Sequence, residues 1–429
     1  MYIRCYYNEK HFLAQTPAPL AAGASCTQAA VRIAQTRFST TIDDKAAAAT
    51  SISPQRNPFT SNNISSLSGD FILMSRIDVV ERYLETINII ERYLEIAVAR
   101  EHFSGVVMVI HQGEILLNQG YGMASVDTEN RSHTVIHVAA ITKQFTAAAI
   151  MLLQEAGKID LDKSINCYLP IKYQSDWWKN VTVHHLLSHT GGVVDYAAER
   201  DYYDVRKGFC FGNTVSGMIR EARSKKLEFE PGSAFHYSNI GYTILGVIIE
   251  KIANQPYSKF IKERLLRPLG MSSSGIHEET HVEKYEEAKG HRYDEKQQKL
   301  VNDDEISFPV TAPAGGLFTT TEDLLKWNNV ISGKTTGVLS SKSIERMTTP
   351  VKNTSTSDGR YGYGLFIDKS SGTKKIHHPG RIVGFRSHFC LYPENKVYIA
   401  VLCNNTKVDP MKISEGISGI LEKGSGLTS

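Results

Sequence analysis

The 429-residue sequence has no run of about 18 apolar residues, so no membrane-spanning helix is expected. Neither sign of charge is in excess, because 48 lysines and arginines stand against 45 aspartates and glutamates. There is no basic run of the kind that binds nucleic acid, and there is no acidic tail. These absences leave a soluble globular protein as the expected class.

Paired cysteines are missing as well. The six cysteines are scattered, with no Cys-x-x-Cys pair and no cysteine–histidine spacing typical of a metal site. We expect mostly free thiols, and a disulfide bridge is the alternative. A continuous apolar stretch behind the first positive charges is also missing, so the sequence does not predict a secretory signal peptide. The compartment and the oligomeric state are not predicted.

The N-terminal segment has little that could join a hydrophobic core. It is rich in Ala, Ser, Thr, Gln and Asn and shows no sustained helical or strand period. Residues 1–70 are therefore expected to be a disordered leader that is dispensable for folding, ahead of a folded domain over residues 76–425. Four basic residues against a single acidic one before residue 43 leave an organelle presequence as the alternative.

Periodic patterns predict secondary structure from residue 77 onwards. Residues 77–100 have a helical pattern, and residues 103–122 predict a β-hairpin about a Gln112-Gly113 turn. Later patterns predict strands at 362–367, 382–392 and 396–403, and a helix at 410–421.

This order of elements predicts an α/β (α+β) fold. One sheet is expected to form from both ends of the domain, over about residues 100–122 and 360–405. A helical subdomain over about residues 143–350 is expected to lie between them in the chain.

A lysine stands where an apolar helix begins. Residues 138–153 have the pattern of a helix that is apolar nearly all round and therefore buried. A buried ammonium needs a partner, or its pKa falls towards that of a neutral amine. Lys143 is therefore a candidate functional group, and a structural ion pair with a carboxylate is the alternative.

Two further stretches carry polar groups at turns. Tyr237 and Asn239 stand two residues apart in a turn before a helix, so both side chains can point into one cleft. Local turn hydrogen bonds are the alternative. The stretch His378-Pro379-Gly380 opens a strand-like segment, and its glycine lets a ligand approach the backbone unless it marks a bulge.

Three histidines between residues 184 and 192 raise the question of a metal site. Their spacing matches neither His-Glu-x-x-His nor a Cys/His finger. Local polar contacts at a helix end account better for His184, His185 and His189, so no metal and no cofactor are expected. A metal hydrolase built on these histidines ranks behind the hypotheses below.

Several stretches together resemble the serine β-lactamase-related family, which groups class C β-lactamases, D-alanyl-D-alanine carboxypeptidases and related esterases and peptidases. The resemblance covers about residues 103–405. It is carried, in order and at family-like spacings, by Thr142-Lys143-Gln144-Phe145-Thr146, His185-Leu186-Leu187-Ser188-His189-Thr190-Gly191-Gly192, Tyr237-Ser238-Asn239-Ile240-Gly241-Tyr242, Pro268-Leu269-Gly270-Met271, Ala314-Gly315-Gly316-Leu317 and His378-Pro379-Gly380. The resemblance implies a β-lactamase/transpeptidase-like fold, with an antiparallel sheet flanked by helices and a helical subdomain.

The family transfers acyl groups through the serine of a Ser-x-x-Lys motif, whose serine and lysine share a helix face. The resemblance assigns Lys143 and Tyr237 to the proton relay, and Asn239 to holding a substrate amide or the lysine. A small-molecule or peptide ligand is therefore the implied partner.

The third motif of the family corresponds to His378 and Gly380. A cation at His378 would lie near the tyrosine oxygen or a substrate carboxylate. The resemblance places the two N–H groups of an oxyanion hole at Ala140 and in the strand near Arg381, so Gly380 and Arg381 are implied substrate-binding residues.

The sequence departs from the family at the nucleophile, because Ala140 occupies the serine position. A methyl group cannot attack a carbonyl. Thr142 is no substitute, since two residues along a helix correspond to about 200° of rotation. Two hypotheses follow: a serine acyl hydrolase scaffold for amide, peptide or ester substrates that is inactive as written, or a binding or regulatory protein that uses the same cleft without turnover. Whether the alanine is natural or introduced stays open.

Overall fold

The computed structural model describes residues 64–195, 214–277, 287–297, 299–303, 312–354, 359–370 and 372–424. The chain divides into two compact units, residues 1–73 and residues 74–429. The predicted leader lies outside the described residues up to position 63. Helix α2 (Ile64–Glu101) starts before the predicted position 77 and continues across the unit boundary.

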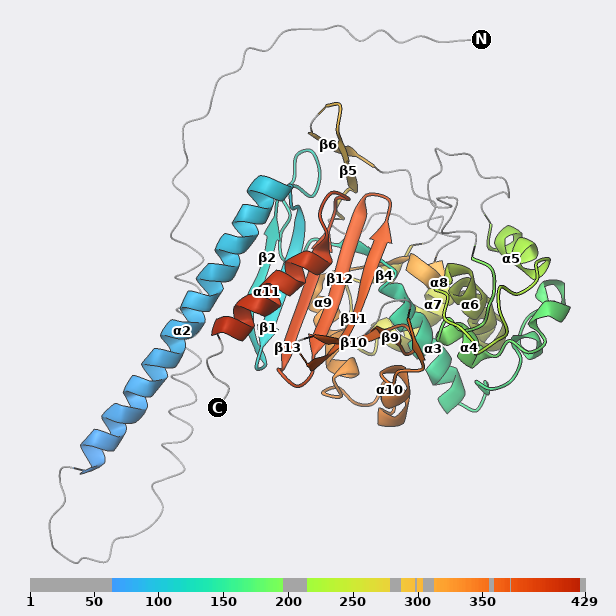
Figure 1. Ribbon diagram of the computed structural model, residues 1–429, viewed down its shortest axis with the longest axis horizontal. Coiled ribbons are helices and arrows are strands. Elements are labelled where there is room, and N and C mark those ends of the chain that lie inside the picture. The colour runs from blue at the N-terminus through green and yellow to red at the C-terminus, as the bar shows by residue number, and fades with distance from the viewer. Residues whose placement is uncertain are drawn as a thin grey trace, which may run out of the picture. The chain divides into compact units, whose positions relative to one another are not determined.

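Unit 74–429 is organised around one antiparallel sheet (Figure 1). Its strand order is β2-β1-β13-β12-β11-β10-β9-β8. The strands are β1 (Gly105–His111), β2 (Glu114–Tyr121), β8 (Lys352–Asn353), β9 (Arg360–Tyr361), β10 (Phe366–Ser370), β11 (Thr373–Ile382), β12 (Phe385–Tyr392) and β13 (Val397–Cys403). Strand β1 pairs with β13, so the sheet joins both ends of the unit. The α/β fold with an antiparallel sheet, predicted from the sequence, is confirmed.

The helical part and two small sheets are formed by the middle of the chain. The helices are α3 (Thr142–Glu155), α4 (Val183–Leu187), α5 (Val215–Arg223), α6 (Asn239–Ala253), α7 (Tyr257–Ile261), α8 (Ala312–Gly315), α9 (Thr321–Ile331), α10 (Ser341–Met347) and, at the end, α11 (Pro410–Gly424). Short 3-10 turns are η2 (Ile165–Cys167), η3 (Ile171–Tyr173) and η4 (Asp176–Trp178), and η6 (Lys262–Leu266) is a π-helical turn. The small sheets contain β3 (Ile136–Ala139), β7 (Leu317–Thr319) and β4 (Gly275–Ile276), and β5 (His291–Asp294) with β6 (Lys299–Asn302).

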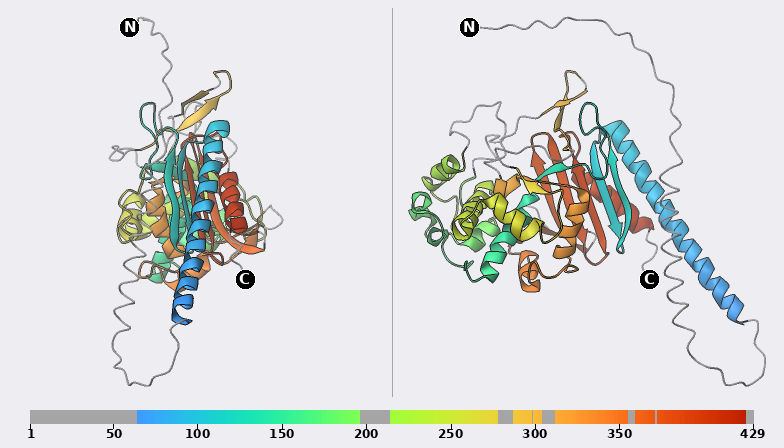
Figure 2. Two further views of the ribbon diagram at one scale, coloured as in Figure 1. Left: turned by 90° about the vertical axis from the view of Figure 1, so that its left-hand side faces the viewer. Right: turned by 180° about the vertical axis from the view of Figure 1, so that it is seen from behind.

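Both faces of the large sheet are covered, which explains the unbroken apolar run in β1. Val107 and Val109 pack in one core with residues of α11, whereas Val106 and Met108 belong to the core shared with α3 and α6. The edge-on view in Figure 2 shows α11 on one side of the sheet and the helical part on the other. In a strand that is buried on both faces, successive side chains are all apolar, so its sequence does not alternate between apolar and polar residues.

The predicted strand at 382–392 overlaps strand β11 only at Ile382, so the rest of β11 was missed. It contains lysines, histidines and Pro379, which are poor strand signals. Its pairing with β12 runs from Ile376 to Ile382, but β10 pairs only as far as His377. Pro379 therefore lies where β11 has one strand partner, and such a position tolerates the missing N–H.

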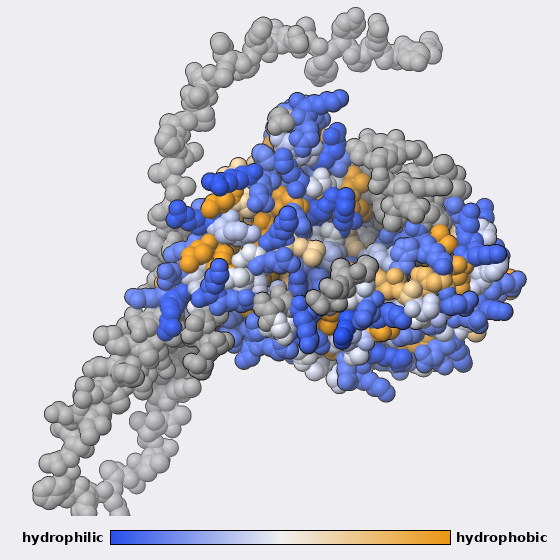
Figure 3. All heavy atoms as spheres, in the orientation of Figure 1, coloured by the Kyte–Doolittle hydropathy of each residue, from blue (hydrophilic) through white to orange (hydrophobic). Residues whose placement is uncertain are grey.

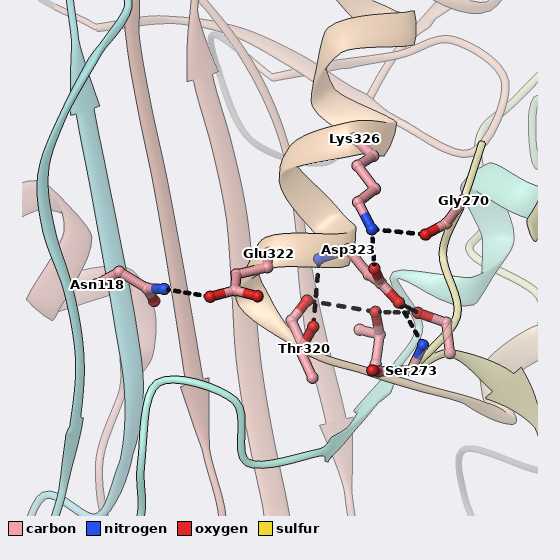
Figure 4. Close-up of polar contacts among 9 residues, drawn as sticks. Asn118, Gly270, Ser273, Thr320, Glu322, Asp323 and Lys326 are labelled. Carbon is pink, nitrogen blue, oxygen red and sulfur yellow. Dashed lines mark hydrogen bonds and ion pairs between the residues drawn. The ribbon is translucent and has the colours of Figure 1, made fainter.

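A buried aspartate connects α9 to the loop after η6 (Figure 4). Asp323 accepts hydrogen bonds from Ser273 N at 2.9 Å and from Ser274 Oγ at 2.7 Å. Lys326 Nζ lies 2.7 Å from Asp323 Oδ1 and also donates to the carbonyl of Gly270. The Pro-Leu-Gly-Met stretch is thus fixed to the helix beside it.

The surface is mixed in character. Hydrophilic residues cover most of the face shown in Figure 3, with smaller hydrophobic groups between them. Within the described ranges, no helix has both the length and the apolar character that crossing a bilayer requires. Cys167, Cys390 and Cys403 are free thiols, and the other three cysteines lie outside the described residues.

We expect a chain that begins at Met74 to fold as the full chain does, because unit 74–429 has its own hydrophobic cores. Its thermal unfolding midpoint, followed by circular dichroism, should match that of the full chain. A chain that begins at residue 98 is the control, since it lacks buried Ile90 and Leu94 and should lose about 4 kcal/mol. A large drop in the midpoint for the Met74 chain would contradict this boundary.

Candidate active site at the start of helix α3

The turn between β3 and α3 carries Ala140, the position at which the sequence predicted the nucleophile. Ala139 has a left-handed φ of 48°, and the partly exposed Ala140 follows it. Thr142 Oγ1 donates to Ala139 O at 2.6 Å and accepts from Leu317 N at 2.9 Å. The Thr142 hydroxyl is therefore committed to backbone groups, in agreement with its exclusion as a substitute nucleophile.

Gly380 allows the end of β3 to approach β11. A Cβ atom at Gly380 would lie 2.2 Å from the carbonyl oxygen of Val138. Ser387 on the neighbouring strand donates to the same carbonyl, with an Oγ–O distance of 2.8 Å. The close approach that the sequence suggested at this glycine is thus made by the protein's own backbone, next to the Ala139–Ala140 turn.

The Lys143 amine is fully buried behind this turn. Its Nζ donates to Asn239 Oδ1 and to Ala314 O, at 2.8 Å each, and lies 4.7 Å from the centroid of the Tyr237 ring. Burial lowers the pKa of Lys143 to about 7, and the charge of Asp195 opposes this shift. The amine can therefore exchange protons near neutral pH, as a general base must.

The turn with Tyr237 and Asn239 places both residues against the lysine. Ser238, between them, caps α6 by accepting the N–H of Gly241 at 3.0 Å. The backbone N–H of Asn239 donates to Asp195 Oδ2. Helix α6 is buried from Ile240 to Ile249.

His378 lies near Tyr237, with 6.1 Å between the ring centroids. Its Nδ1 donates to Pro379 O at 2.6 Å, and its Nε2 lies 3.2 Å from the hydroxyl of Tyr361. Burial and the charge of Lys143 hold the pKa of His378 well below its ordinary value. These contacts favour a neutral imidazole over the cation that the family resemblance implied.

Arg381 is exposed and lies one residue beyond Gly380 on β11. Strand alternation places its side chain on the same face as His377, opposite to His378. His377 bonds to Asp368 and His388 on that opposite face. The implied contribution of Arg381 therefore falls to its backbone, and it stays a prediction.

Three contributions to the site were missed from the sequence: the Tyr361 hydroxyl, the Asp195 carboxylate and the Ala314 carbonyl. The Ala314-Gly315-Gly316 stretch was part of the family pattern in the sequence. That pattern indicated that the stretch belongs to the site, but it did not predict the hydrogen bond from Lys143 to the Ala314 carbonyl. Tyr361 and Asp195 had no motif around them. A backbone carbonyl has no sequence signature at all.

The three histidines between residues 184 and 192 make polar contacts with their surroundings. His184 Nδ1 lies 2.6 Å from the Tyr363 hydroxyl, and His185 Nδ1 accepts the N–H of Thr182 at 3.2 Å. No group of three histidine, cysteine, aspartate or glutamate side chains suited to a metal occurs among the residues described. The local-contact interpretation of these histidines fits this geometry.

Comparison with known proteins gives the same family over most of the chain. The family model described as Beta-lactamase matches residues 87–416. A penicillin-binding protein of Bacillus subtilis (strain 168) is 28% identical over 322 residues, which cover 71% of this chain and 69% of that protein. Protein flp of Staphylococcus aureus (strain COL) is 27% identical over 314 residues, and the matched part spans only 60% of its length.

Solved structures agree on the fold. An octameric penicillin-binding protein homologue from Pyrococcus abyssi has a TM-score of 0.70 at 29% identity, covering 79% of this chain and 77% of that one. A D-amino acid amidase from Ochrobactrum anthropi SV3 has a TM-score of 0.68 at 23% identity, covering 80% of this chain and all of that one, which shows the fold alone. Because the family model matches well over half of its length, the chain belongs to the serine β-lactamase-related family.

Proposed function

We propose that the protein binds the acyl group of an amide, peptide or ester ligand at the Lys143 site and does not form an acyl-enzyme. The observation that carries this proposal is Ala140, which stands three residues before a buried lysine that is otherwise arranged as a general base. The lysine, tyrosine and asparagine that assist acyl transfer in this family are together, but the atom that attacks the carbonyl is missing.

The chemistry of the site supports acyl ligands. Tyr237 and Asn239 contact the Lys143 amine, so polar groups of the kind that orient a carbonyl converge next to Ala140. Two relatives that are named penicillin-binding proteins also support acyl ligands. Without a side-chain oxygen at position 140, the bound carbonyl would meet a methyl group, and hydrolysis through a covalent intermediate could not begin.

The native chain should therefore bind acyl ligands reversibly. We would titrate a panel of a penicillin, phenylalanine amide and a D-alanyl-D-alanine peptide against the native chain by NMR, and measure intact mass after incubation. Saturable shifts without added mass are expected for at least one ligand. Tyr237→Phe is the matched variant, since it keeps the ring over Lys143 and removes only the hydroxyl; weaker binding is expected.

Two results would contradict the proposal. An adduct on the native chain that disappears in Lys143→Met would show that another residue acts as nucleophile. Absence of saturable binding across the whole panel, in a chain with a native spectrum, would show that the site no longer recognises acyl groups.

A further inference from the structure

The segment 189–192 runs directly beside the chain that leads into the Tyr237 turn. Three backbone hydrogen bonds join the two: His236 N to His189 O at 2.9 Å, Gly232 N to Thr190 O at 2.8 Å, and Glu228 N to Gly192 O at 2.8 Å. A Cβ atom at Gly192 would lie 2.3 Å from Phe229 O, so the glycine permits this approach. Segment 189–192 therefore fixes the position of the loop before the Tyr237 turn through backbone hydrogen bonds.

His189 adopts a backbone conformation that ordinarily favours glycine. Its φ is +57°, in the left-handed region. Such a conformation costs a residue with a side chain about 1 kcal/mol or more. A glycine at this position would relieve the strain. The presence of histidine therefore indicates that its side chain has a role that offsets the cost of the backbone conformation.

The imidazole of His189 holds the turn at its centre. Its Nδ1 accepts the backbone N–H of Ser238, the residue between Tyr237 and Asn239, at 3.0 Å. Its ring centroid lies 4.3 Å from that of Tyr237 and 4.7 Å from that of Tyr361. One buried ring thus fixes the turn's backbone and supports the tyrosine ring.

The direction of this hydrogen bond fixes the protonation state of His189. Because Nδ1 is the acceptor, the ring is neutral with its proton on Nε2, which has no hydrogen-bond partner among the described residues. Burial lowers the pKa of His189 well below its ordinary value, and the charge of Lys143 lowers it further. A protonated ring would direct an N–H at the N–H of Ser238 and break the contact.

We propose that His189 is a positioning residue, whose neutral imidazole holds the Tyr237–Asn239 turn so that the phenol ring and the amide oxygen stay on the Lys143 amine. The proposal deepens the proposed function, since it names what keeps the acyl-binding groups in register. It concerns the surroundings of Lys143 itself, which can be measured without any ligand.

His189→Gly and His189→Asn form the test pair, because both residues accept a left-handed φ and backbone strain is therefore not the difference between them. Asparagine keeps an acceptor oxygen near the position of Nδ1, and glycine keeps none. The readout is the pH titration of the Lys143 ε-carbon by NMR in lysine-labelled protein, with the signal assigned by its loss in Lys143→Met.

His189→Gly should raise the pKa of the Lys143 amine by about one unit or more, a tenfold change in proton affinity. The reason is that the turn loosens and water reaches the amine, which weakens the effect of burial. His189→Asn should restore most of the native value. Ser188→Ala is the matched control: its hydroxyl bonds to His184 O and Thr190 within the same region, so its loss should lower stability and leave the Lys143 titration unchanged.

A folded His189→Gly chain with the native Lys143 titration would overturn the proposal. Should that variant not fold, the native chain itself decides, since long-range nitrogen NMR of histidine-labelled protein reports the tautomer of each ring. The expected result is a neutral His189 ring with its proton on Nε2 only, persisting below pH 6. A proton on Nδ1 of His189 would refute the assignment. Ligand binding enters neither measurement, so failure here is separable from failure of the binding proposal.

Discussion

Ala140→Ser should convert a chain that forms no adduct into one that a fluorescent penicillin or a fluorophosphonate labels covalently at residue 140. The substitution adds one hydroxyl in the turn three residues before Lys143, whose amine has a pKa of about 7 and can accept the hydroxyl proton. Loss of the nucleophile in a serine hydrolase can cost on the order of a million-fold in turnover. We expect the labelling rate to rise by at least about a hundredfold over the native chain, because Lys143, Tyr237 and Asn239 are already in contact with one another.

Peptide mass mapping after labelling should place the adduct on residue 140. Ala140→Ser combined with Lys143→Met is the first control, and it should remove labelling because the serine loses its base. Ala140→Val is the second, since it changes bulk at the same position and adds no oxygen. A folded Ala140→Ser chain that remains unlabelled would indicate a site remodelled around Pro379 and would favour a binding protein that has lost the geometry for acyl transfer.

Lys143→Met should make the protein more stable at pH 6 and less stable at pH 9.5. The pKa of Lys143 falls from 10.5 to about 7 on folding. Between these values the unfolded chain binds a proton that the folded chain does not, so the contribution of Lys143 to the free energy of unfolding rises with pH across this window. Below pH 7 the buried ammonium costs at most about 5 kcal/mol, from 3.5 pKa units at about 1.4 kcal/mol each.

Methionine removes this cost together with the hydrogen bonds to Asn239 and Ala314, whose loss costs about 1–3 kcal/mol. The net gain at pH 6 should therefore be about 2–4 kcal/mol, and because only about 1.4 kcal/mol of the cost remains at pH 9.5, the loss of the hydrogen bonds should reverse the sign there. Urea unfolding at the two pH values measures both. Lys326→Met is the control, since Lys326 is partly exposed and bonds to Asp323 and Gly270; its loss should destabilise the protein at either pH. A variant less stable than the native chain at pH 6 would show that Lys143 is a structural partner rather than a strained functional group.

The sequence predicted the parts of the fold that depend on local patterns. The β1–β2 hairpin, helix α3 and the strands β12 and β13 follow from apolar runs and turn residues. Strand β11 was missed because several of its polar residues are buried, and hydrogen bonds between histidines and an aspartate replace apolar packing there. No local pattern distinguishes such a strand from a loop.

The candidate site shows the same division. Lys143 stood out because a charge inside an apolar helix requires an explanation, and Tyr237 and Asn239 stood out through their turn and through the family pattern. Tyr361 and Asp195 reach the site from distant parts of the chain, and their contacts exist only after the sheet and the helical part have packed. His189 was seen in the sequence as one of three histidines, and only its contacts with the Ser238 N–H and the Tyr237 and Tyr361 rings distinguish it from the others.

The pairing of β1 with β13 also governs how this chain can be made. Gly105 lies opposite Cys403 and His111 opposite Val397, so this pairing joins segments almost 300 residues apart. During synthesis the β1–β2 hairpin is made long before β13, so the two apolar faces of β1 and its unpaired edge stay exposed until the last strands leave the ribosome. Contacts of such long range are formed slowly, and an open edge in the meantime is a template for aggregation. We therefore expect folding to be limited by the arrival of β13, and the yield of folded protein to depend on shielding of the hairpin during that interval.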